Sequence, residues 1–351
     1  MNLRTYKVSS VLKKKQIYFI SNPADVFYLS GFNGTFGKII ISPGKAAFMT
    51  DPRYEGMVLR SKIAGDFEII ITKNFEYDLL LLIKEKEVLL NKNIPLSEYL
   101  LINNNCRGTR LDSTVSSLRM IKDEKEIELI RKSVSITEKT MKHTAKILKA
   151  GISEKDLGLE FDYYSRKQGA DGLSFSSIIA FNENGAVPHH ATSSRKLKTN
   201  TLVLVDAGVK YKGYASDLTR VFAFGIIQPR LRQIQKYCES VLKAKKIGLL
   251  SYKPGVIIKE ADLAARKSLA QDGLDRYFTH SLGHGMGLDV HEPPSVNPKE
   301  ELKFEKGMVF SCEPGVYFDH KYGIRIEDDY LITDKGADKL GEFSDSLIIC
   351  D

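Results

Sequence analysis

The sequence predicts an α+β protein of two domains, the second of which is built from two similar halves. Three observations support this fold class. The chain has 351 residues, which is long for a single domain. Residues 1 to about 115 alternate short apolar strands with helices. From about residue 120 onward, the order helix, helix, strand, hairpin occurs twice.

The N-terminal region contains short apolar runs and amphipathic stretches separated by turn residues. These patterns predict strands at residues 16–20, 38–41 and 67–72, and helices at residues 52–63 and 77–86. Few paired acids or histidines lie in apolar surroundings here. We therefore expect this domain to have a structural or substrate-gating role.

The first half of the second domain begins with a predicted long helix at residues 122–149, whose apolar residues recur at roughly helical spacing. Ser153 and Asp156 form a capping-box-like start for a second helix, which continues to about residue 167. A predicted strand at residues 174–180 and a polar loop then lead into the first hairpin.

The second half repeats this order. It has predicted helices at residues 231–250 and 259–270, a strand near Tyr277 and a glycine-histidine segment that leads into the second hairpin. We expect the functional site where the two halves meet.

The first hairpin, residues 201–224, places one carboxylate in each of two apolar strands, at Asp206 and Asp217. A two-residue turn at residues 211–212 would set these two acids directly opposite each other, about 5 Å apart. Two anions on a buried sheet repel each other and lose solvation. A bound cation between them resolves both problems, and a metal ion is the simplest candidate.

The second hairpin begins at Met308 and repeats the pattern. Asp206 is echoed by Glu313 and Asp217 by Glu327, so four carboxylates are expected to meet across an internal pseudo-twofold axis. The alternative is that these acids form salt bridges at strand ends, which is common for one carboxylate but would have to occur four times in matched contexts. The sequence therefore favours a metal site.

Between the hairpins, residues 279–294 contain His280, His284 and His291 among several glycines. The segment contains neither the HExxH motif of helical zinc sites nor the lysine of a phosphate-binding loop. Imidazole combined with carboxylates suits Mn, Fe, Co or Zn. Cys312 precedes Glu313 on its strand, so we expect the thiol to point to the opposite face.

The composition excludes several other functions. The net charge of +8 comes from lysines and arginines scattered among acids, which predicts a solvated surface and no nucleic-acid partner. No run of 18 apolar residues and no signal peptide is found, so no membrane association is expected. The four cysteines form no CxxC pair, which indicates reduced thiols in a cytoplasmic protein.

The motifs together identify a family resemblance. The second domain contains, in order, VDAG, SDLTR, GHGMGLDVHEPP, CEPGVY and GIRIEDD, and the first contains SNPADVFYLSGF and TDPRY. This set resembles the pita-bread metallopeptidases, namely aminopeptidase P, prolidase and creatinase-related proteins. The resemblance covers nearly the whole chain. It implies a creatinase-type α/β domain at residues 1–118 and a pseudo-symmetric pita-bread catalytic domain at residues 119–351.

The resemblance also implies roles for individual residues. It assigns a dinuclear metal site, with manganese expected and cobalt, zinc or iron as alternatives, to Asp206, Asp217, His284, Glu313 and Glu327. It makes Glu313 the general base, with His291, His189 and Arg325 as further catalytic residues. His189, His280 and His291 are expected to bind substrate. His190 directly follows His189, so the pocket assignment is open between the two.

The activity implied is hydrolysis of the N-terminal Xaa-Pro bond of peptides or dipeptides by a hydroxide shared between the metals, in a homodimer. The sequence does not separate an aminopeptidase from a dipeptidase. Two alternatives remain: a metal-free pita-bread interaction module or creatinase-like amidinohydrolase, and a dinuclear phosphate-ester hydrolase. The first would be expected to lack metal ligands, and the second would favour basic residues near the metals, where only Arg220 and Arg325 are close in sequence.

Overall fold

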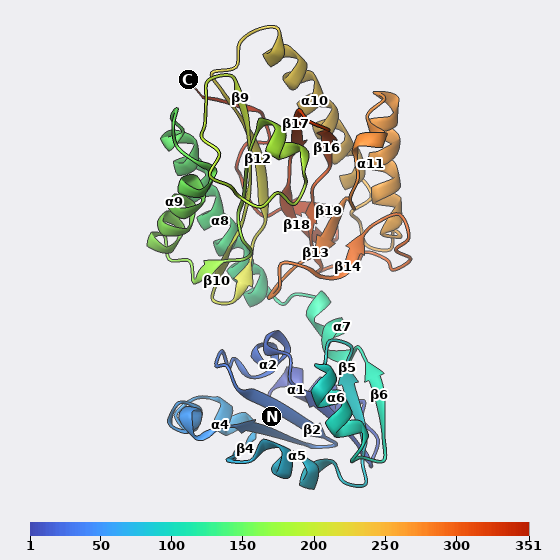
Figure 1. Ribbon diagram of the computed structural model, residues 1–351. Coiled ribbons are helices and arrows are strands. Elements are labelled where there is room, and N and C mark those ends of the chain that lie inside the picture. The colour runs from blue at the N-terminus through green and yellow to red at the C-terminus, as the bar shows by residue number, and fades with distance from the viewer. Residues whose placement is uncertain (351) are drawn as a thin grey trace. The chain divides into compact units, whose positions relative to one another are not determined.

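A computed structural model describes residues 1–350 of the chain. The chain forms two compact units, residues 1–119 and residues 120–351 (Figure 1). Within the described part of the chain, every helix is too short or too polar to cross a membrane.

Unit 1 is a mixed sheet with strand order β4-β3-β2-β1-β5-β6, accompanied by short helices. Its strands are β1 (Gln16–Ile20), β2 (Gly37–Ser42), β3 (Lys45–Thr50), β4 (Glu68–Ile71), β5 (Glu87–Asn91) and β6 (Gly108–Asp112). Its helices are α1 (Leu3–Ser10), α2 (Pro23–Ser30), η1 (Pro52–Tyr54), α3 (Glu55–Leu59), α4 (Ile63–Asp66), α5 (Phe75–Ile83), α6 (Leu96–Asn103) and α7 (Thr114–Met120).

The three strands predicted in unit 1 are confirmed, but β5 and β6 were not predicted, and two further features differ from the prediction. Strand β3 was not predicted; it pairs with β2 through a tight turn in which Gly44 has φ +77°. The helix predicted at residues 52–63 is broken into η1, α3 and α4. The Ser61 hydroxyl donates to Val58 O and accepts from Ile63 N, which closes one helix and starts the next.

Unit 2 contains the four long helices predicted. They are α8 (Glu124–Ile147), α9 (Glu154–Lys167), α10 (Arg230–Leu249) and α11 (Lys259–Gln271). Helix α9 begins with the predicted capping box of Ser153 and Asp156, and α8 begins with a similar box of Asp123 and Glu126. Both helices are therefore fixed at their N-termini.

The strands of unit 2 form two larger sheets, β20-β12-β9-β8 and β14-β13-β15-β18-β19, and two small ones, β11-β10-β7 and β16-β17. The strands are β7 (Gly172–Leu173), β8 (Ile178–Phe181), β9 (Thr201–Ala207), β10 (Val209–Tyr211), β11 (Tyr214–Ala215), β12 (Leu218–Phe224), β13 (Gly283–Gly285), β14 (Glu292–Val296), β15 (Val309–Cys312), β16 (Gly315–Phe318), β17 (Tyr322–Arg325), β18 (Asp328–Thr333), β19 (Gly336–Lys339) and β20 (Ile348–Cys350). Two short 3₁₀ helices are η2 (Asn182–Ala186) and η3 (Asp275–Tyr277).

The strands lie between the helix pair α8–α9 and the helix pair α10–α11 (Figure 1). Along β9, Leu202 and Leu204 pack into the core on the α10–α11 side, whereas Val203 and Val205 pack into the core on the α8–α9 side. Both faces of this strand are therefore buried, which explains its continuous apolar run. By the same alternation, Asp206 lies on the face of Leu204.

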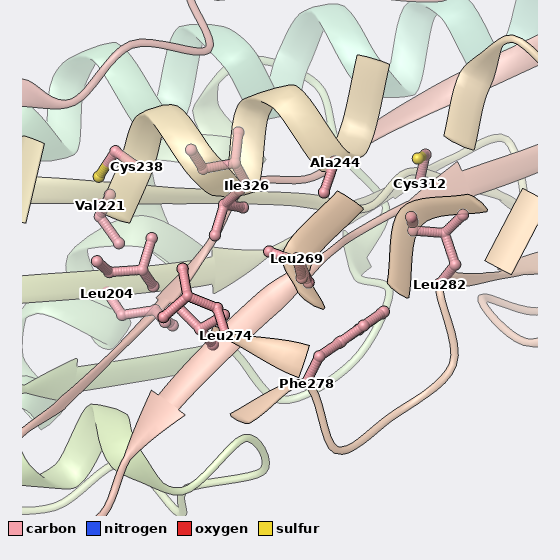
Figure 2. Close-up of a cluster of buried hydrophobic side chains, with 14 of the residues drawn as sticks. Leu204, Val221, Cys238, Ala244, Leu269, Leu274, Phe278, Leu282, Cys312 and Ile326 are labelled. Carbon is pink, nitrogen blue, oxygen red and sulfur yellow. The ribbon is translucent and has the colours of Figure 1, made fainter. Parts of the chain in front are cut away.

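One hydrophobic core joins the two halves of unit 2. Figure 2 shows Leu204 and Val221 of the first hairpin close to Ile326 of the second, with Cys238 and Leu269 from the covering helices. Since side chains from both halves share this core, the hairpins are held in a fixed relation to each other.

The register of the first hairpin differs from the prediction. The turn residues are Lys212 and Gly213, both with positive φ, rather than residues 211–212. A two-residue hairpin turn of this type needs positive φ at both positions, and glycine adopts it without strain. The one-residue shift of the turn moves the strand register by two, so Asp206 lies opposite Thr219 and not opposite Asp217.

A second difference concerns the strand predicted near Tyr277. That residue lies in η3, and the strand of this segment, β13, begins only at Gly283. The predicted strand at residues 174–180 is shorter and later, because β8 begins at Ile178.

Gly208 lies between β9 and β10, where the first hairpin passes from one sheet to another. A substitution at this residue tests the hairpin geometry. A Cβ at Gly208 would lie 1.8 Å from the backbone oxygen of Ser216, next to Asp217. We expect Gly208→Ala to lower the free energy of unfolding, measured by urea denaturation, by about 2 kcal/mol or more, since a backbone atom must move. Gly158→Ala in α9 is the control, because its Cβ would meet only ordinary contacts at 3.7 Å. Equal stability of both variants would contradict this account of the hairpin.

Candidate active site

One pocket in unit 2, of about 560 Å³, contains every site residue predicted from the sequence. The predicted residues that line it are His189, Asp206, Asp217, His280, His284, His291, Glu313, Arg325 and Glu327. His190 lines it as well, together with the apolar residues Phe175, Ile178, Pro188 and Ala191.

The two hairpins deliver their acids at strand ends. Asp206 is the penultimate residue of β9, and Asp217 directly precedes β12, the antiparallel partner of β9. Glu313 directly follows β15 and Glu327 directly precedes β18. Cys312 pairs with Asp328 across these two antiparallel strands. The next pair in this register places Glu313 opposite Glu327. The irregular backbone at these strand ends directs the acids into one space.

Hydrogen bonds connect the second hairpin to its neighbours at these positions. The Glu327 amide donates to Thr219 O at 3.2 Å, which ties it to the first hairpin. The Glu313 amide donates to Leu282 O at 2.8 Å, which ties it to the histidine segment. The carboxylates therefore project from a backbone that is cross-linked between the two halves.

His284 lies in β13 and faces the carboxylates. Its Nδ1 is 3.2 Å from Gly285 O, so this nitrogen carries the proton and donates it to the carbonyl. Its Nε2 then has a free lone pair, which lies 3.6 Å from Asp217 Oδ2 and 3.5 Å from Glu313 Oε1. Burial, and then the neighbouring His291, lowers the pKa of His284 to about 3, which keeps the imidazole neutral. A neutral imidazole beside two carboxylates is a suitable metal ligand.

Burial of the four acids is electrostatically costly. Burial, and then Glu327, raises the pKa of Asp217 well above its usual range; burial, and then Glu313, does the same for Glu327. Burial raises the pKa of Glu313 to about 8, although Arg325 acts against this shift. Asp217, Glu313 and Glu327 are thus held where they resist ionisation.

The chemistry of this donor set fits divalent cations. Potential ligand atoms of Asp217, His284 and Glu327 lie within 4.8 Å of one another. Asp206 Oδ1 and Asp217 Oδ1 are buried without a hydrogen-bond partner among residues 1–350. Buried oxygens left unpaired in this way are costly unless a cation satisfies them.

Arg325 neutralises part of the acidic charge. Its guanidinium donates to Asp206 Oδ2 at 2.6 Å, to Tyr317 Oη at 2.5 Å and to Thr219 Oγ1 at 3.1 Å. Thr219 Oγ1 in turn donates to Glu327 Oε2 at 2.5 Å. Arg325 therefore orients acids from both hairpins. Sequence reasoning missed Tyr317 and Thr219, although both lie inside the quoted motifs.

The protonation of His280 follows from its two neighbours. Its Nδ1 donates to Ser281 O at 2.8 Å, so its Nε2 accepts from Tyr317 Oη at 2.8 Å. Burial, and then Arg325, lowers the pKa of His280 to about 3, which keeps it neutral. His280 is thus coupled to the acids through Tyr317 and Arg325.

The remaining histidines lie at the pocket wall. The rings of His284 and His291 are 4.2 Å apart between centroids. His189 is close enough to His291 to lower its pKa, after the larger effect of partial desolvation. His190 is instead turned to Glu154, with Nε2 2.9 Å from Oε2. Both residues line the pocket, and His189 is the one that lies close to His291.

Two buried acids beside the site were not predicted. Asp329 Oδ2 accepts from the Asp217 amide at 2.9 Å. Asp328 forms ion pairs with Arg220 and Lys245, all fully buried. Arg220 also donates to Glu327 O at 2.5 Å. These contacts fix the backbone on either side of the site. Arg220 supports the site from outside, because it does not line the pocket. Nothing in the sequence pattern separates such supporting acids from those that face the pocket.

Cys312 lies in the hydrophobic core near Leu282, as strand alternation predicts (Figure 2). All four cysteines are free thiols.

The raised carboxyl pKa values predict how stability depends on pH when metal is removed. A carboxyl whose pKa is raised by folding stabilises the protein below its ordinary pKa, and this contribution is lost as the pH rises through the folded value. His280 and His284 are neutral in the fold, whereas unfolded histidine, with an ordinary pKa of 6.5, still loses protons above pH 6.5, so these two residues oppose the loss only slightly. Between pH 6.5 and 8, chelator-treated protein should therefore lose stability, measured by thermal unfolding.

Glu313→Gln is the matched variant for this experiment, since it removes the carboxyl whose pKa is about 8. Its loss of stability over the same pH interval should be smaller. A rise in stability of the wild type, or an equal fall in both proteins, would contradict the proposed repulsion.

The comparisons with known proteins identify the family of the chain. The sequence profile of Metallopeptidase family M24 matches residues 128–334, and that of the Creatinase/Prolidase N-terminal domain matches residues 4–121. The chain is 32% identical over 351 residues to a protein from Pyrococcus horikoshii named Xaa-Pro dipeptidase, covering 99% of each.

Solved structures give the same result. The structure titled Xaa-Pro dipeptidase from Bacillus anthracis matches with a TM-score of 0.91 and 29% identity, over 99% of each chain. An X-Pro aminopeptidase from Thermotoga maritima matches with a TM-score of 0.86 and 31% identity, over 97% of this chain and 99% of that one. These matches confirm the predicted creatinase-type N-terminal domain and pita-bread fold. The chain belongs to metallopeptidase family M24.

Proposed function

We propose that this metallopeptidase hydrolyses the N-terminal Xaa-Pro bond of peptides or dipeptides, as a prolidase or an aminopeptidase P. The observation that carries the proposal is the convergence of Asp206, Asp217, His284, Glu313 and Glu327 on one pocket of an M24 domain. The proteins named Xaa-Pro dipeptidase and X-Pro aminopeptidase match the whole chain, which supports the same bond preference.

These five residues would hold two divalent ions, for which manganese is our first choice and cobalt, zinc or iron are alternatives. The unpaired oxygens of Asp206 and Asp217 and the free Nε2 lone pair of His284 support this assignment. When bound, such ions polarise the scissile carbonyl and make hydroxide available near neutral pH.

The protein's own residues then move and hold protons. Glu313 accepts the proton of the attacking water and returns it to the leaving nitrogen. His291, at the pocket wall, donates a hydrogen bond to the oxygen on which negative charge develops. Arg325 keeps Asp206 and Tyr317 in place, while His189 and His280 contact the substrate. Each of these roles uses a side chain that already lines the pocket.

The preference for proline is compatible with the pocket wall. A prolyl nitrogen carries no N–H, so it needs no acceptor from the protein in the bound substrate. Phe175, Ile178, Pro188 and Ala191 supply apolar surface beside the histidines, against which a pyrrolidine ring can pack.

The alternative functions are less well supported. A metal-free interaction module or a creatinase-like amidinohydrolase would be expected to have lost ligands, whereas all five are present in one pocket. A phosphate-ester hydrolase would need available cations near the metals. Arg220 is buried against Asp328, and Arg325 is bonded to Asp206, Tyr317 and Thr219.

Three features stay predictions at this stage. They are manganese as the metal, a homodimeric assembly and a cytoplasmic location. The scattered surface charge continues to argue against a nucleic-acid partner.

Hydrolysis of Ala-Pro and of Ala-Pro-Ala by protein loaded with Mn²⁺ tests the proposal. We expect release of alanine from at least one of them, because the pocket accepts a prolyl amide. Faster cleavage of Ala-Pro would indicate a dipeptidase, and faster cleavage of Ala-Pro-Ala an aminopeptidase. Ala-Ala-Ala is the control substrate and should react more slowly. Inertness towards both prolyl peptides, in protein that retains Mn²⁺, would refute the proposed function.

A further inference from the structure

A buried glutamate outside the pocket organises the segment that carries His189. Glu154 is the first residue of α9, and its side chain is 0% exposed. Its Oε1 accepts hydrogen bonds from Phe181 N and Asn184 Nδ2, both at 2.8 Å. Its Oε2 accepts from His190 Nε2 at 2.9 Å, Ser193 N at 2.9 Å and Ser193 Oγ at 2.6 Å. All five donors come from residues 181–193.

This arrangement explains how a carboxylate is tolerated in the interior. Burial alone would raise the pKa of Glu154, but the hydrogen bonds from Ser193, His190 and Asn184 outweigh it, so the pKa lies below its usual range. The position at a helix N-terminus favours the negative charge as well. The charge is therefore compensated mainly when residues 181–193 fold around it.

Regular secondary structure holds only the start of this segment, and the Thr192 hydroxyl adds hydrogen bonds, donating to Ser177 O and accepting from Ile179 N. After the short helix η2 (Asn182–Ala186), residues 187–195 form neither helix nor strand. Asn184 and His190, both bonded to Glu154, flank His189, while Pro188 and Ala191 line the pocket beside it. The contact with Glu154 holds the ring of His190, which also lines the pocket, and His189 is the neighbour that lies close to His291.

We infer that Glu154 is a positioning residue that fixes residues 181–193 so that His189 faces the substrate pocket. The second half of unit 2 contains a comparable contact. Asp262, in the first turn of α11, accepts from Leu282 N at 3.0 Å and pairs with Arg266, which donates to Phe278 O at 2.8 Å. That segment carries His280. In both halves, an acid in the first turn of the second helix thus anchors a histidine-bearing segment.

The test uses Glu154→Gln, because the amide keeps the size of the side chain but removes its charge and sets an NH₂ group against the donors. This test rests on the proposed function, because its readout is kcat/KM for an Xaa-Pro peptide. We expect a loss of about tenfold, as small displacements of a positioned group are costly, with bound Mn²⁺ unchanged. Glu160→Gln is the matched control. It makes the same change on the same helix, where Glu160 is 39% exposed and pairs with His143. It should leave kcat/KM unchanged.

A double-mutant cycle separates positioning from general destabilisation. If Glu154 acts through His189, Glu154→Gln should lower kcat/KM by less than about twofold in the His189→Ala background. The same tenfold loss in both backgrounds would overturn the inference. Ser193→Ala removes only the hydroxyl donor and gives a milder variant, whose smaller loss should likewise vanish in the His189→Ala background.

Hydrogen exchange supplies a readout that needs no activity. The amides of Phe181 and Ser193 donate to Glu154, so they should exchange faster in Glu154→Gln than in the wild type or in Glu160→Gln. Unchanged exchange would overturn the anchoring role. A wild type that retains Mn²⁺ but cleaves no Xaa-Pro peptide would instead refute the proposed function, and the exchange experiment would still test the anchor.

Discussion

The repulsion among four carboxylates that line one pocket is the constraint on which the rest of unit 2 depends. Asp206, Asp217, Glu313 and Glu327 line one pocket, and burial raises the pKa of three of them. A fold gains nothing in stability from this arrangement by itself. It is maintained because the backbone that presents the acids is fixed by contacts elsewhere, and because cations can satisfy the charge.

Those contacts form a cross-linked frame around the acids. The two hairpins share a hydrophobic core, and the Glu327 amide bonds to Thr219 O across them. Arg325 joins Asp206 to the second hairpin from inside the pocket, whereas Arg220 holds Glu327 O from outside it. Positive charge is therefore placed on both sides of the acids, which leaves the pocket itself available for metal and substrate.

Much of the site could be predicted because its residues stand in repeated local contexts. Asp206 is followed by Ala207 and a glycine, and Glu313 by Pro314 and a glycine. The apolar runs around both acids predict buried strands. The long helices were predicted because capping boxes and apolar spacing are local signals. These signals are strong enough to locate the acids without any knowledge of tertiary contacts.

Two features were not predicted for different reasons: one is a local turn geometry, and the other is a contact between residues distant in the sequence. The hairpin register followed from positive φ at Lys212 and Gly213, and a turn misplaced by one residue shifted the pairing of Asp206 by two. Glu154 resembles any acid at a helix start until residues 181–193 are seen to fold around it. No periodicity in the chain encodes that contact.

The number of divalent ions bound per chain tests the central claim most directly. The measurement is elemental analysis after Mn²⁺ loading and dialysis, on the wild type, on Asp217→Asn and on Asp319→Asn. Asp319 is an exposed control on the second hairpin turn. The account predicts about two ions in the wild type and the control, and loss of both metal and hydrolysis in Asp217→Asn. A wild type that binds no ions, or an Asp217→Asn variant that keeps its metal and full activity, would contradict it.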